Sequence, residues 1–236
     1  MRKMLLLLVI LGGCAQDARL PASYFAEGAH VLDPGQVSVT GAAGGGASVW
    51  GEAAGASGRV HVGIGDNQEI GVEASAEELR VPADRCFFGC DSSETNAMET
   101  LAAYSALASW KLGLTPNLAL IAEGGVGKHD LVSGDAANDY FGHSVDGAFG
   151  LVFSRPISKE TDVYLGGEVA LAVPYGPRST DATSVVGATA AVGLDHAFEH
   201  SLHGFVEGGG RLMFEGEDAW IPNLAIDGVA GIRIIL

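Results

Sequence analysis

Hydrophobic and polar residues alternate along most of the chain. In the segment 161–174, for example, Val163 and Leu165 fall on one side of an extended chain, while Asp162 and Glu168 fall on the other. A period of two residues is that of a β-strand with one apolar and one polar face. The same alternation predicts strands at 36–45, 57–66, 68–77, 100–115, 117–128, 142–155, 161–174, 184–198, 202–214 and 223–236.

The connections between these predicted strands alternate in length. Those at 66–67, 115–117, 156–160 and 199–201 are short, and the others are longer. Because consecutive antiparallel strands reverse direction, all the short connections then fall at one end of the sheet. The pattern predicts an all-β fold, an antiparallel up-and-down barrel of about ten strands, with eight or twelve strands as alternatives.

This architecture resembles the small outer-membrane β-barrels of bacteria, and the resemblance covers residues 36–236. Those barrels combine an even number of strands, short periplasmic turns, longer outer loops and segments of about 10 alternating residues. The resemblance implies that the apolar faces contact lipid. Leu236 departs from it, because such barrels often end in Phe or Trp.

Alternation does not decide which face is inside, so a soluble barrel with its apolar face inward is the alternative. The predicted strands are long enough for a tilted membrane span, which needs about 9–11 residues. Aromatic residues on the apolar face also lie near strand ends, as in the interfacial girdles of membrane proteins. These residues are Tyr104, Trp110, Phe153, Phe198 and Phe214. We therefore expect a membrane barrel.

The N-terminus carries a separate signal. Two basic residues precede an apolar run at 4–11, which is shorter than the roughly 20 residues of a transmembrane helix and predicts a signal peptide over 1–13. The sequence Leu11-Gly12-Gly13-Cys14 then resembles the bacterial lipobox. This resemblance implies that Cys14 is acylated and becomes the new N-terminus, whereas ordinary cleavage nearby would leave Cys14 unmodified.

The position after Cys14 is Ala15 rather than Asp, which for lipoproteins of the enteric type implies delivery to the outer membrane. The domains expected are the signal peptide 1–13, a lipidated polar tether at 14–35 and the barrel at 36–236. We expect the anchored N-terminus on the periplasmic side. The partners implied are outer-membrane lipid and the machineries for lipoprotein export and barrel assembly.

The charge of the chain narrows the classes of ligand. The formal net charge of −16 becomes −18 once the two basic residues of the leader are removed. A protein this acidic is a poor binder of nucleic acid. No motif points to a cofactor or to a particular ligand.

The polar face of the strands would line the lumen of a membrane barrel. We expect a network of charges there, formed by Arg59, His61, Glu73, Lys111, Glu123, Glu168, Asp195, Glu207, Arg211, Asp227 and Arg233. Counting outward from each turn places His61 opposite Glu73 with Arg59 diagonal to it, Arg211 near Asp227, Lys111 near Glu123, and His203 near Asp195. Charges in a narrow lumen must pair or remain hydrated.

Cys86 and Cys90 enclose three residues in the long connection after the third predicted strand. In an exported protein this spacing favours a disulfide. The pair could also begin a metal site, but neither a second cysteine pair nor a cluster of nearby histidines completes four ligands.

One group of residues could carry chemistry. His129, Ser144 and Asp146 could all face inward near the long-loop end, where a His–Ser–acid arrangement would make the serine nucleophilic. Asp130, Asp135 and Asp139 share that region, but their spacing lacks the pattern of a calcium loop. The simpler interpretation is that the residues of both groups are solvated polar residues at the rim of the barrel.

The function expected from these features is that of an outer-membrane barrel lipoprotein with a structural or surface-interaction role and without enzymatic activity. Three alternatives remain open: a narrow cation-preferring channel, a rim hydrolase acting on lipid or peptide, and a soluble lipid-anchored barrel that binds a ligand.

Overall fold

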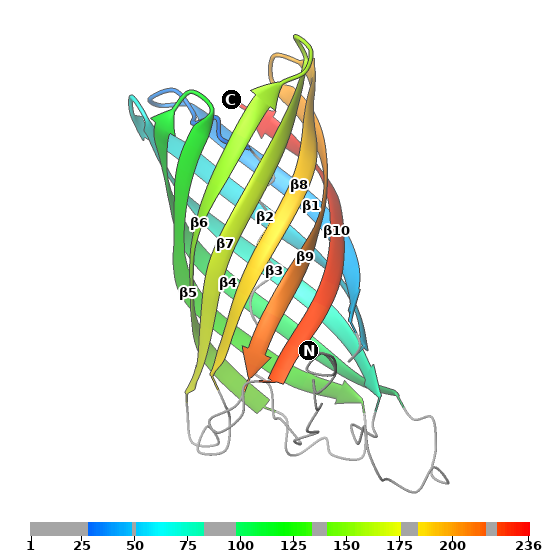
Figure 1. Ribbon diagram of the computed structural model, residues 1–236. Helices are drawn as coiled ribbons and strands as arrows, with labels where there is room; N and C mark the ends of the chain where they lie inside the picture. Colours follow the sequence, from blue (N-terminus) through cyan, green and yellow to red (C-terminus); the bar gives the residue numbers. More distant parts are fainter. Residues whose placement is uncertain (1–27, 49–50, 83–97, 134–140, 176–183, 216–220) are drawn as a thin grey trace, which may run out of the picture.

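The computed structural model describes residues 28–48, 51–82, 98–133, 141–175, 184–215 and 221–236. These residues form a closed barrel of ten strands in which each strand pairs antiparallel with its two neighbours (Figure 1). The strands are β1 (Val37–Ser48), β2 (Gly51–Gly65), β3 (Gln68–Pro82), β4 (Met98–Thr115), β5 (Leu118–Ser133), β6 (Phe141–Pro156), β7 (Thr161–Tyr175), β8 (Val185–Glu199), β9 (Leu202–Glu215) and β10 (Ile221–Ile235). The predicted fold class and strand number are confirmed.

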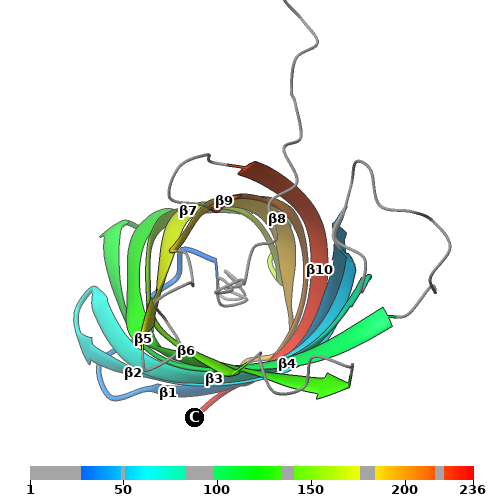
Figure 2. The same cartoon turned by 90° about the horizontal axis from the view of Figure 1, so that it is seen from below.

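The ring closes where the first strand meets the last, as the view along the axis shows (Figure 2). β1 pairs with β10 from Ser38 opposite Ile235 to Ser48 opposite Ala225. Beyond this register, the N–H of Val37 donates to the carbonyl of Leu236 at 3.1 Å, and the N–H of Leu236 donates back at 2.8 Å. The C-terminal residue therefore takes part in the closure.

The two ends of the barrel differ in their connections. At one end, called here the turn end, the strands are joined by 66–67, 116–117, 157–160 and 200–201. The opposite end, the loop end, carries 83–97, 134–140, 176–184 and 216–220. It also carries 49–50, which corrects the longer connection expected at 46–56. Glycine and alanine dominate 41–58, so alternation is invisible there, yet the pairing of β1 with β2 continues to Ser48 opposite Gly51.

The two faces of the sheet have opposite polarity. Buried positions on the inner face carry Ser, Thr, His, Asp, Glu, Lys and Arg side chains, together with apolar clusters that include Val152, Val185 and Phe205. The outer face exposes large hydrophobic side chains, including Val72, Phe149, Val169, Val192 and Ile226. The face that alternation marks as apolar is therefore the outer face of the barrel. Among the described residues, no helix is long and apolar enough to cross a membrane.

The aromatic residues expected in girdles lie on this outer face. Trp110, Phe153 and Phe198 are exposed in the part of the barrel near the turn end. Tyr104 is exposed on the loop-end side of Trp110, and Phe214 is the penultimate residue of β9 at the loop end.

Rings on the inner face cover glycines of the neighbouring strand. Tyr164 lies opposite Gly193, and Phe205 lies opposite Gly231. A Cβ added at either glycine would overlap the facing ring. The absence of a side chain at these two positions therefore lets each ring lie flat against the wall of the lumen.

This packing predicts that Gly193→Ala destabilises the barrel, because the added methyl group would displace the buried Tyr164 ring. We expect the free energy of unfolding in urea to fall by about 1–3 kcal/mol, the usual cost of overpacking. Gly167→Ala on the outer face is the matched control, since its Cβ would meet no atom closer than the Thr189 carbonyl oxygen at 3.8 Å. Equal effects of the two substitutions would contradict the proposed packing.

Candidate functional site

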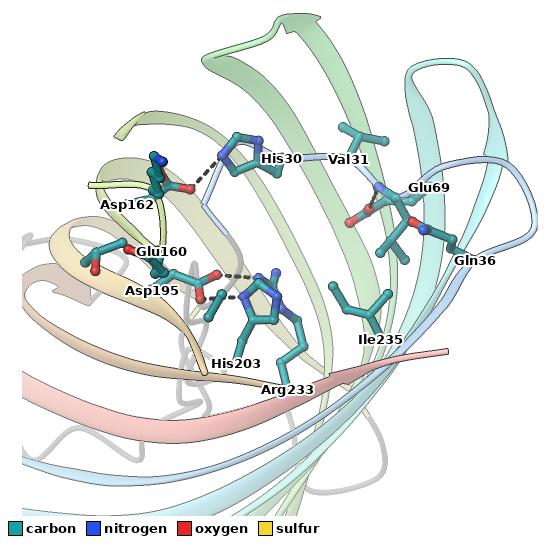
Figure 3. Close-up of a pocket in the computed structure, with 14 residues that line it drawn as sticks. His30, Val31, Gln36, Glu69, Glu160, Asp162, Asp195, His203, Arg233 and Ile235 are labelled. Carbon is teal, nitrogen blue, oxygen red and sulfur yellow. Dashed lines mark hydrogen bonds and ion pairs between the residues drawn. The ribbon is translucent and has the colours of Figure 1, made fainter. Parts of the chain in front are cut away.

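The most distinctive polar site lies in the lumen at the turn end. There the carboxylate of Asp195 in β8 contacts both Arg233 of β10 and His203 of β9 (Figure 3). His203 Nδ1 lies 3.0 Å from Asp195 Oδ1, and Arg233 Nη2 contacts the other carboxylate oxygen. The carboxylate and the guanidinium are both buried, so each charge has its counter-ion where water is scarce.

A second cluster surrounds Glu69 of β3 on the opposite wall. Lys111 of β4 is its partner in the strand register, and Lys111 Nζ lies 3.4 Å from Glu69 Oε1. His61 Nδ1 lies 3.3 Å from the same oxygen. The ion pair that the structure gives Lys111 is thus with Glu69, whereas Glu123, its expected neighbour, is not opposite it.

Arg59 and Glu73 form a buried ion pair deeper in the lumen. They are direct partners in the register of β2 and β3, and His61 lies opposite Gly71. Counting along the sequence from the turn placed His61 opposite Glu73. This predicted register is wrong. The register shift between Gly63 and Gly65 moves the pairing away from a simple count from the turn.

The remaining lumen residues show the same mixture of charges. Arg211 Nη2 lies 3.6 Å from Asp227 Oδ2, as neighbouring strands allow. Glu168 and Glu207 are buried on the inner face, and Glu123 is half-buried there. Acidic groups outnumber basic ones among the described lumen residues.

The main chain before β1 completes the site. Residues 28–36, the N-terminal segment, pass across the turn end inside the ring (Figure 2). Gly35 donates to the Gly63 carbonyl in β2 at 2.8 Å, and Leu32 donates to Glu69 Oε2 in β3 at 2.9 Å. The segment therefore begins its path along the wall formed by β2 and β3.

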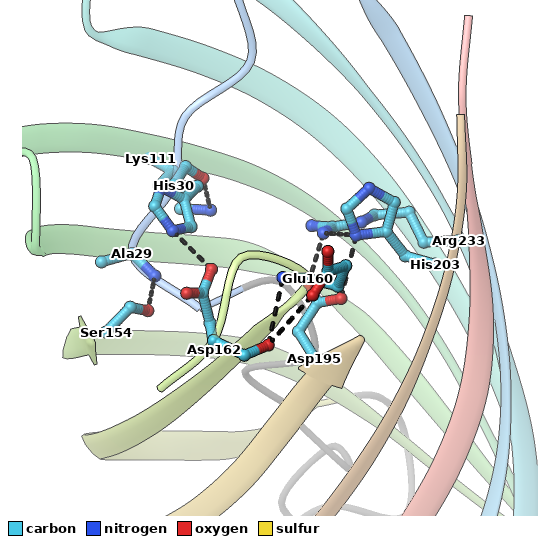
Figure 4. A network of polar contacts seen from close by, with 10 residues as sticks. Ala29, His30, Lys111, Ser154, Glu160, Asp162, Asp195, His203 and Arg233 are labelled. Carbon is cyan, nitrogen blue, oxygen red and sulfur yellow. Dashed lines mark hydrogen bonds and ion pairs between the residues drawn. The ribbon is translucent and has the colours of Figure 1, made fainter. Parts of the chain in front are cut away.

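The other half of the N-terminal segment reaches the far wall (Figure 4). The His30 carbonyl accepts a 2.5 Å hydrogen bond from Lys111 Nζ, and the Ala29 N–H donates to Ser154 Oγ of β6. His30 Nε2 lies 2.8 Å from Asp162 Oδ2 of β7. Because β2 and β7 are five strands apart in a ring of ten, the segment crosses the lumen from one side to the other.

A hollow of about 210 Å³ remains at this end, between the N-terminal segment and the strands β8 to β10 (Figure 3). His30 and Leu32 line it on one side, and Asp195, His203 and Arg233 line it on the other. Its charged lining suits water and small polar solutes better than an apolar ligand. The described residues contain no group of three or more His, Cys, Asp or Glu side chains placed to hold a metal ion.

The candidate hydrolase residues lie away from this site, toward the loop end. Ser144 and Asp146 are buried on the inner face of β6. The register places His129 opposite Gly142, next to the position at which Ser144 lies opposite Gly127. Ser144 is fully buried, which does not suit a nucleophile that must meet a large substrate.

Other residues singled out in the sequence lie outside the described residues. These are Cys14, Cys86, Cys90, Asp135 and Asp139. The acylation and the disulfide expected from them stay predictions.

The sequence did not single out Ser154 or the N-terminal segment as parts of the site. Ser154 shares its inner face with Ser144 and Asp146, so alternation could have placed it in the lumen. No local pattern indicates the segment's course, because its contacts join residues up to 132 positions apart.

Comparison with known proteins does not identify this chain. No family model and no curated protein matches the sequence. Among solved structures, the outer-membrane protease OmpT from Escherichia coli is 10% identical, with 88% of this chain and 100% of that chain covered and a TM-score of 0.43. An outer-membrane channel from Pseudomonas putida F1 is 10% identical, with 85% and 97% covered and a TM-score of 0.46. Neisserial surface protein A is 14% identical, with 84% and 95% covered and a TM-score of 0.34. Similarity of this extent assigns no function to the chain.

The geometry around Asp195 predicts a large cost for removing its carboxylate. Asp195→Ala would leave Arg233 buried without this counter-ion, and we expect the free energy of unfolding to fall by roughly 3–5 kcal/mol. Denaturant titration of the refolded barrel measures the change.

The matched control is an exposed ion pair of the same type. Glu78 Oε1 lies 3.1 Å from Arg80 Nε, and both side chains are more than half exposed. Glu78→Ala should change stability by less than about 1 kcal/mol, as surface pairs do. A similar loss in both variants would show that burial does not set the strength of the Asp195 contact.

Proposed function

We propose that this protein is an outer-membrane barrel lipoprotein with a structural or surface-interaction role and no enzymatic activity. The observation that carries the proposal is the polarity of the sheet, with large apolar side chains exposed all around a lumen lined by charges. Soluble proteins rarely expose contiguous apolar patches larger than a few hundred Å². A lipid environment accounts for this outer face.

The length of the strands supports the same conclusion. Most have 14 to 18 residues, more than the roughly 9–11 that a tilted strand needs to cross the apolar core of a bilayer. Closure leaves every strand paired on both sides, as the bilayer requires of a spanning sheet.

The lumen favours a structural role over conduction. The ion pairs Arg59–Glu73 and Arg233–Asp195 link neighbouring or nearby strands across the interior. The N-terminal segment also crosses the turn end. A cation-preferring channel remains the second candidate, because the lumen is acidic, and the buried Ser144 weighs against the hydrolase.

The lipid anchor is the second part of the proposal. Cys14 follows the lipobox-like sequence and would carry the acyl chains, with outer-membrane lipid and the export and assembly machineries as partners. At least two acyl chains would hold the N-terminus stably at a membrane, since a single chain binds only marginally.

The membrane proposal predicts the effect of a charge on the outer face. Val192 is 54% exposed at the middle of β8, so Val192→Arg would be nearly neutral in a water-soluble barrel. In a bilayer we expect it to make folding into lipid vesicles less favourable by about 2–4 kcal/mol. Equilibrium folding into vesicles, followed by tryptophan fluorescence, measures the difference.

Ile157→Arg is the control for this substitution. Ile157 is 62% exposed but lies in the turn between β6 and β7, outside the strands. Its replacement should cost at most about 1 kcal/mol, as charges near the interface do. Equal and small effects at both positions would overturn the membrane assignment.

The structural role predicts an electrically silent barrel. Purified full-length protein in a planar bilayer should give no discrete conductance steps, because paired charges and the N-terminal segment narrow the turn end of the lumen. A porin inserted in the same membrane serves as the positive control. Reproducible cation-selective steps would replace the structural role with the channel.

A further inference from the structure

Four side chains form a row around the outside of the barrel near the loop end. They lie on the neighbouring strands β4 to β7, and each is directly opposite the next in the strand register. The row consists of Tyr104, Lys128, His143 and Tyr175. Both tyrosines are exposed, and the rings of His143 and Tyr175 are stacked with their centroids 5.6 Å apart. The row is thus a continuous band of polar and aromatic groups across four strands.

The alternation of burial places Lys128 and His143, called here the basic pair, on the outer face. Their sequence neighbours Gly127 and Ser144 are buried on the inner face. Successive side chains of a strand point to opposite sides of the sheet. The basic pair therefore points away from the lumen, on the same side as the two tyrosines.

The next outward-facing row, one step closer to the turn end, is entirely apolar. It follows the same register and consists of Ala106, Val126, Val145 and Val173. The three valines are exposed. The basic pair thus marks the level at which the outer face of these strands changes from apolar to polar.

The height of the apolar band places this level at a membrane surface. On β6 the outward-facing positions between His143 and Arg155 are Val145, Gly147, Phe149, Leu151 and Phe153. From His143 to Arg155, β6 rises about 41 Å at 3.4 Å per residue, which for a strand tilted by about 40° corresponds to about 31 Å along the axis. Outer-membrane barrels carry an apolar band about 25 Å tall. In a membrane barrel, the basic pair therefore lies level with the head groups of the loop-end leaflet.

The chemistry of the row suits a lipid phosphate. The Lys128 ammonium supplies a positive charge and three hydrogen-bond donors, and the His143 ring donates at least one N–H in either protonation state. The hydroxyls of Tyr104 and Tyr175 are further donors at the two ends of the row. The apolar row next to it would contact the acyl chains of the same lipid molecule.

The acidic residues of this region lie one outward-facing position beyond the row, toward the loop end. Glu78 and Asp130 are both opposite Ala102 there. Glu78 already pairs with Arg80, at 3.1 Å between Oε1 and Nε. A phosphate at the border of the apolar band therefore meets the basic pair before it meets a carboxylate.

We propose that Lys128 and His143, flanked by Tyr104 and Tyr175, bind the phosphate of an anionic lipid in the loop-end leaflet. The site rests on the membrane barrel proposed above, and it gives the surface-interaction role a ligand class and a place. Among the described residues, the outer faces of β8, β9, β10 and β1 carry no basic residue in their loop-end halves. The lipid site is therefore local to β4 to β7.

The test is the affinity of the folded barrel for single lipids. Purified full-length protein is folded in a non-ionic detergent and titrated with phosphatidylglycerol or with phosphatidylcholine, and native mass spectrometry gives the apparent Kd of the first bound lipid. The variants are Lys128→Gln and the conservative Lys128→Arg. Lys159→Gln is the matched control, because it removes an exposed lysine from the turn between β6 and β7. Circular dichroism establishes that each variant keeps its strand content.

We expect the unmodified protein to bind phosphatidylglycerol more tightly than phosphatidylcholine. Lys128→Gln should weaken binding of phosphatidylglycerol about fivefold, the effect of one basic residue near an anionic lipid surface. Lys128→Arg should keep the preference because it keeps the charge, and Lys159→Gln should leave it unchanged.

Equal affinity of the unmodified protein for the two lipids would overturn the lipid site, and so would equal losses in Lys128→Gln and Lys159→Gln. The membrane barrel is tested separately by Val192→Arg. A barrel that shows the expected cost of Val192→Arg but no preference between the lipids would refute the lipid site and leave the membrane barrel standing.

Discussion

The pairing of β1 with β10 is the contact on which the rest of the molecule depends. Ten antiparallel strands in an open sheet would leave two rows of backbone N–H and C=O groups unpaired, and the pairing from Ser38–Ile235 to Ser48–Ala225 removes both rows. Closure also turns the two faces of a sheet into an inside and an outside. The alternation of residues then becomes a separation of environments, with charges in the lumen and apolar side chains around it.

A polar lumen this narrow has to be packed as well as paired. Arginine and lysine side chains reach carboxylates on adjacent or nearby strands, so each such ion pair also ties the wall together. Rings lie flat over glycines of the next strand, which fills the remaining space without crowding the backbone. At the turn end the interior thus combines buried ion pairs with a small apolar cluster around Tyr164 and a hollow of about 210 Å³.

The sequence predicts some features of this structure and misses others. The face of each residue could be predicted, because in segments such as 161–174 a period of two assigns every position from its neighbours. The ends of β1 and β2 could not, since runs of Gly and Ala carry no contrast between faces. The pairing of His61 was also missed, because the register shift between Gly63 and Gly65 has no signature in a count from the turn. The contacts of Ala29 and Leu32 depend on residues distant in the chain, which local pattern cannot reach.

The N-terminal segment has a consequence for the order of assembly. Its hydrogen-bond partners Glu69, Lys111 and Ser154 belong to β3, β4 and β6, and its partner Asp162 belongs to β7. The surface that holds it therefore does not exist until those strands stand side by side. The N-terminal segment is the first part of the described chain to leave the ribosome, yet its binding site forms only later. It can therefore bind only after these strands of the barrel wall have paired.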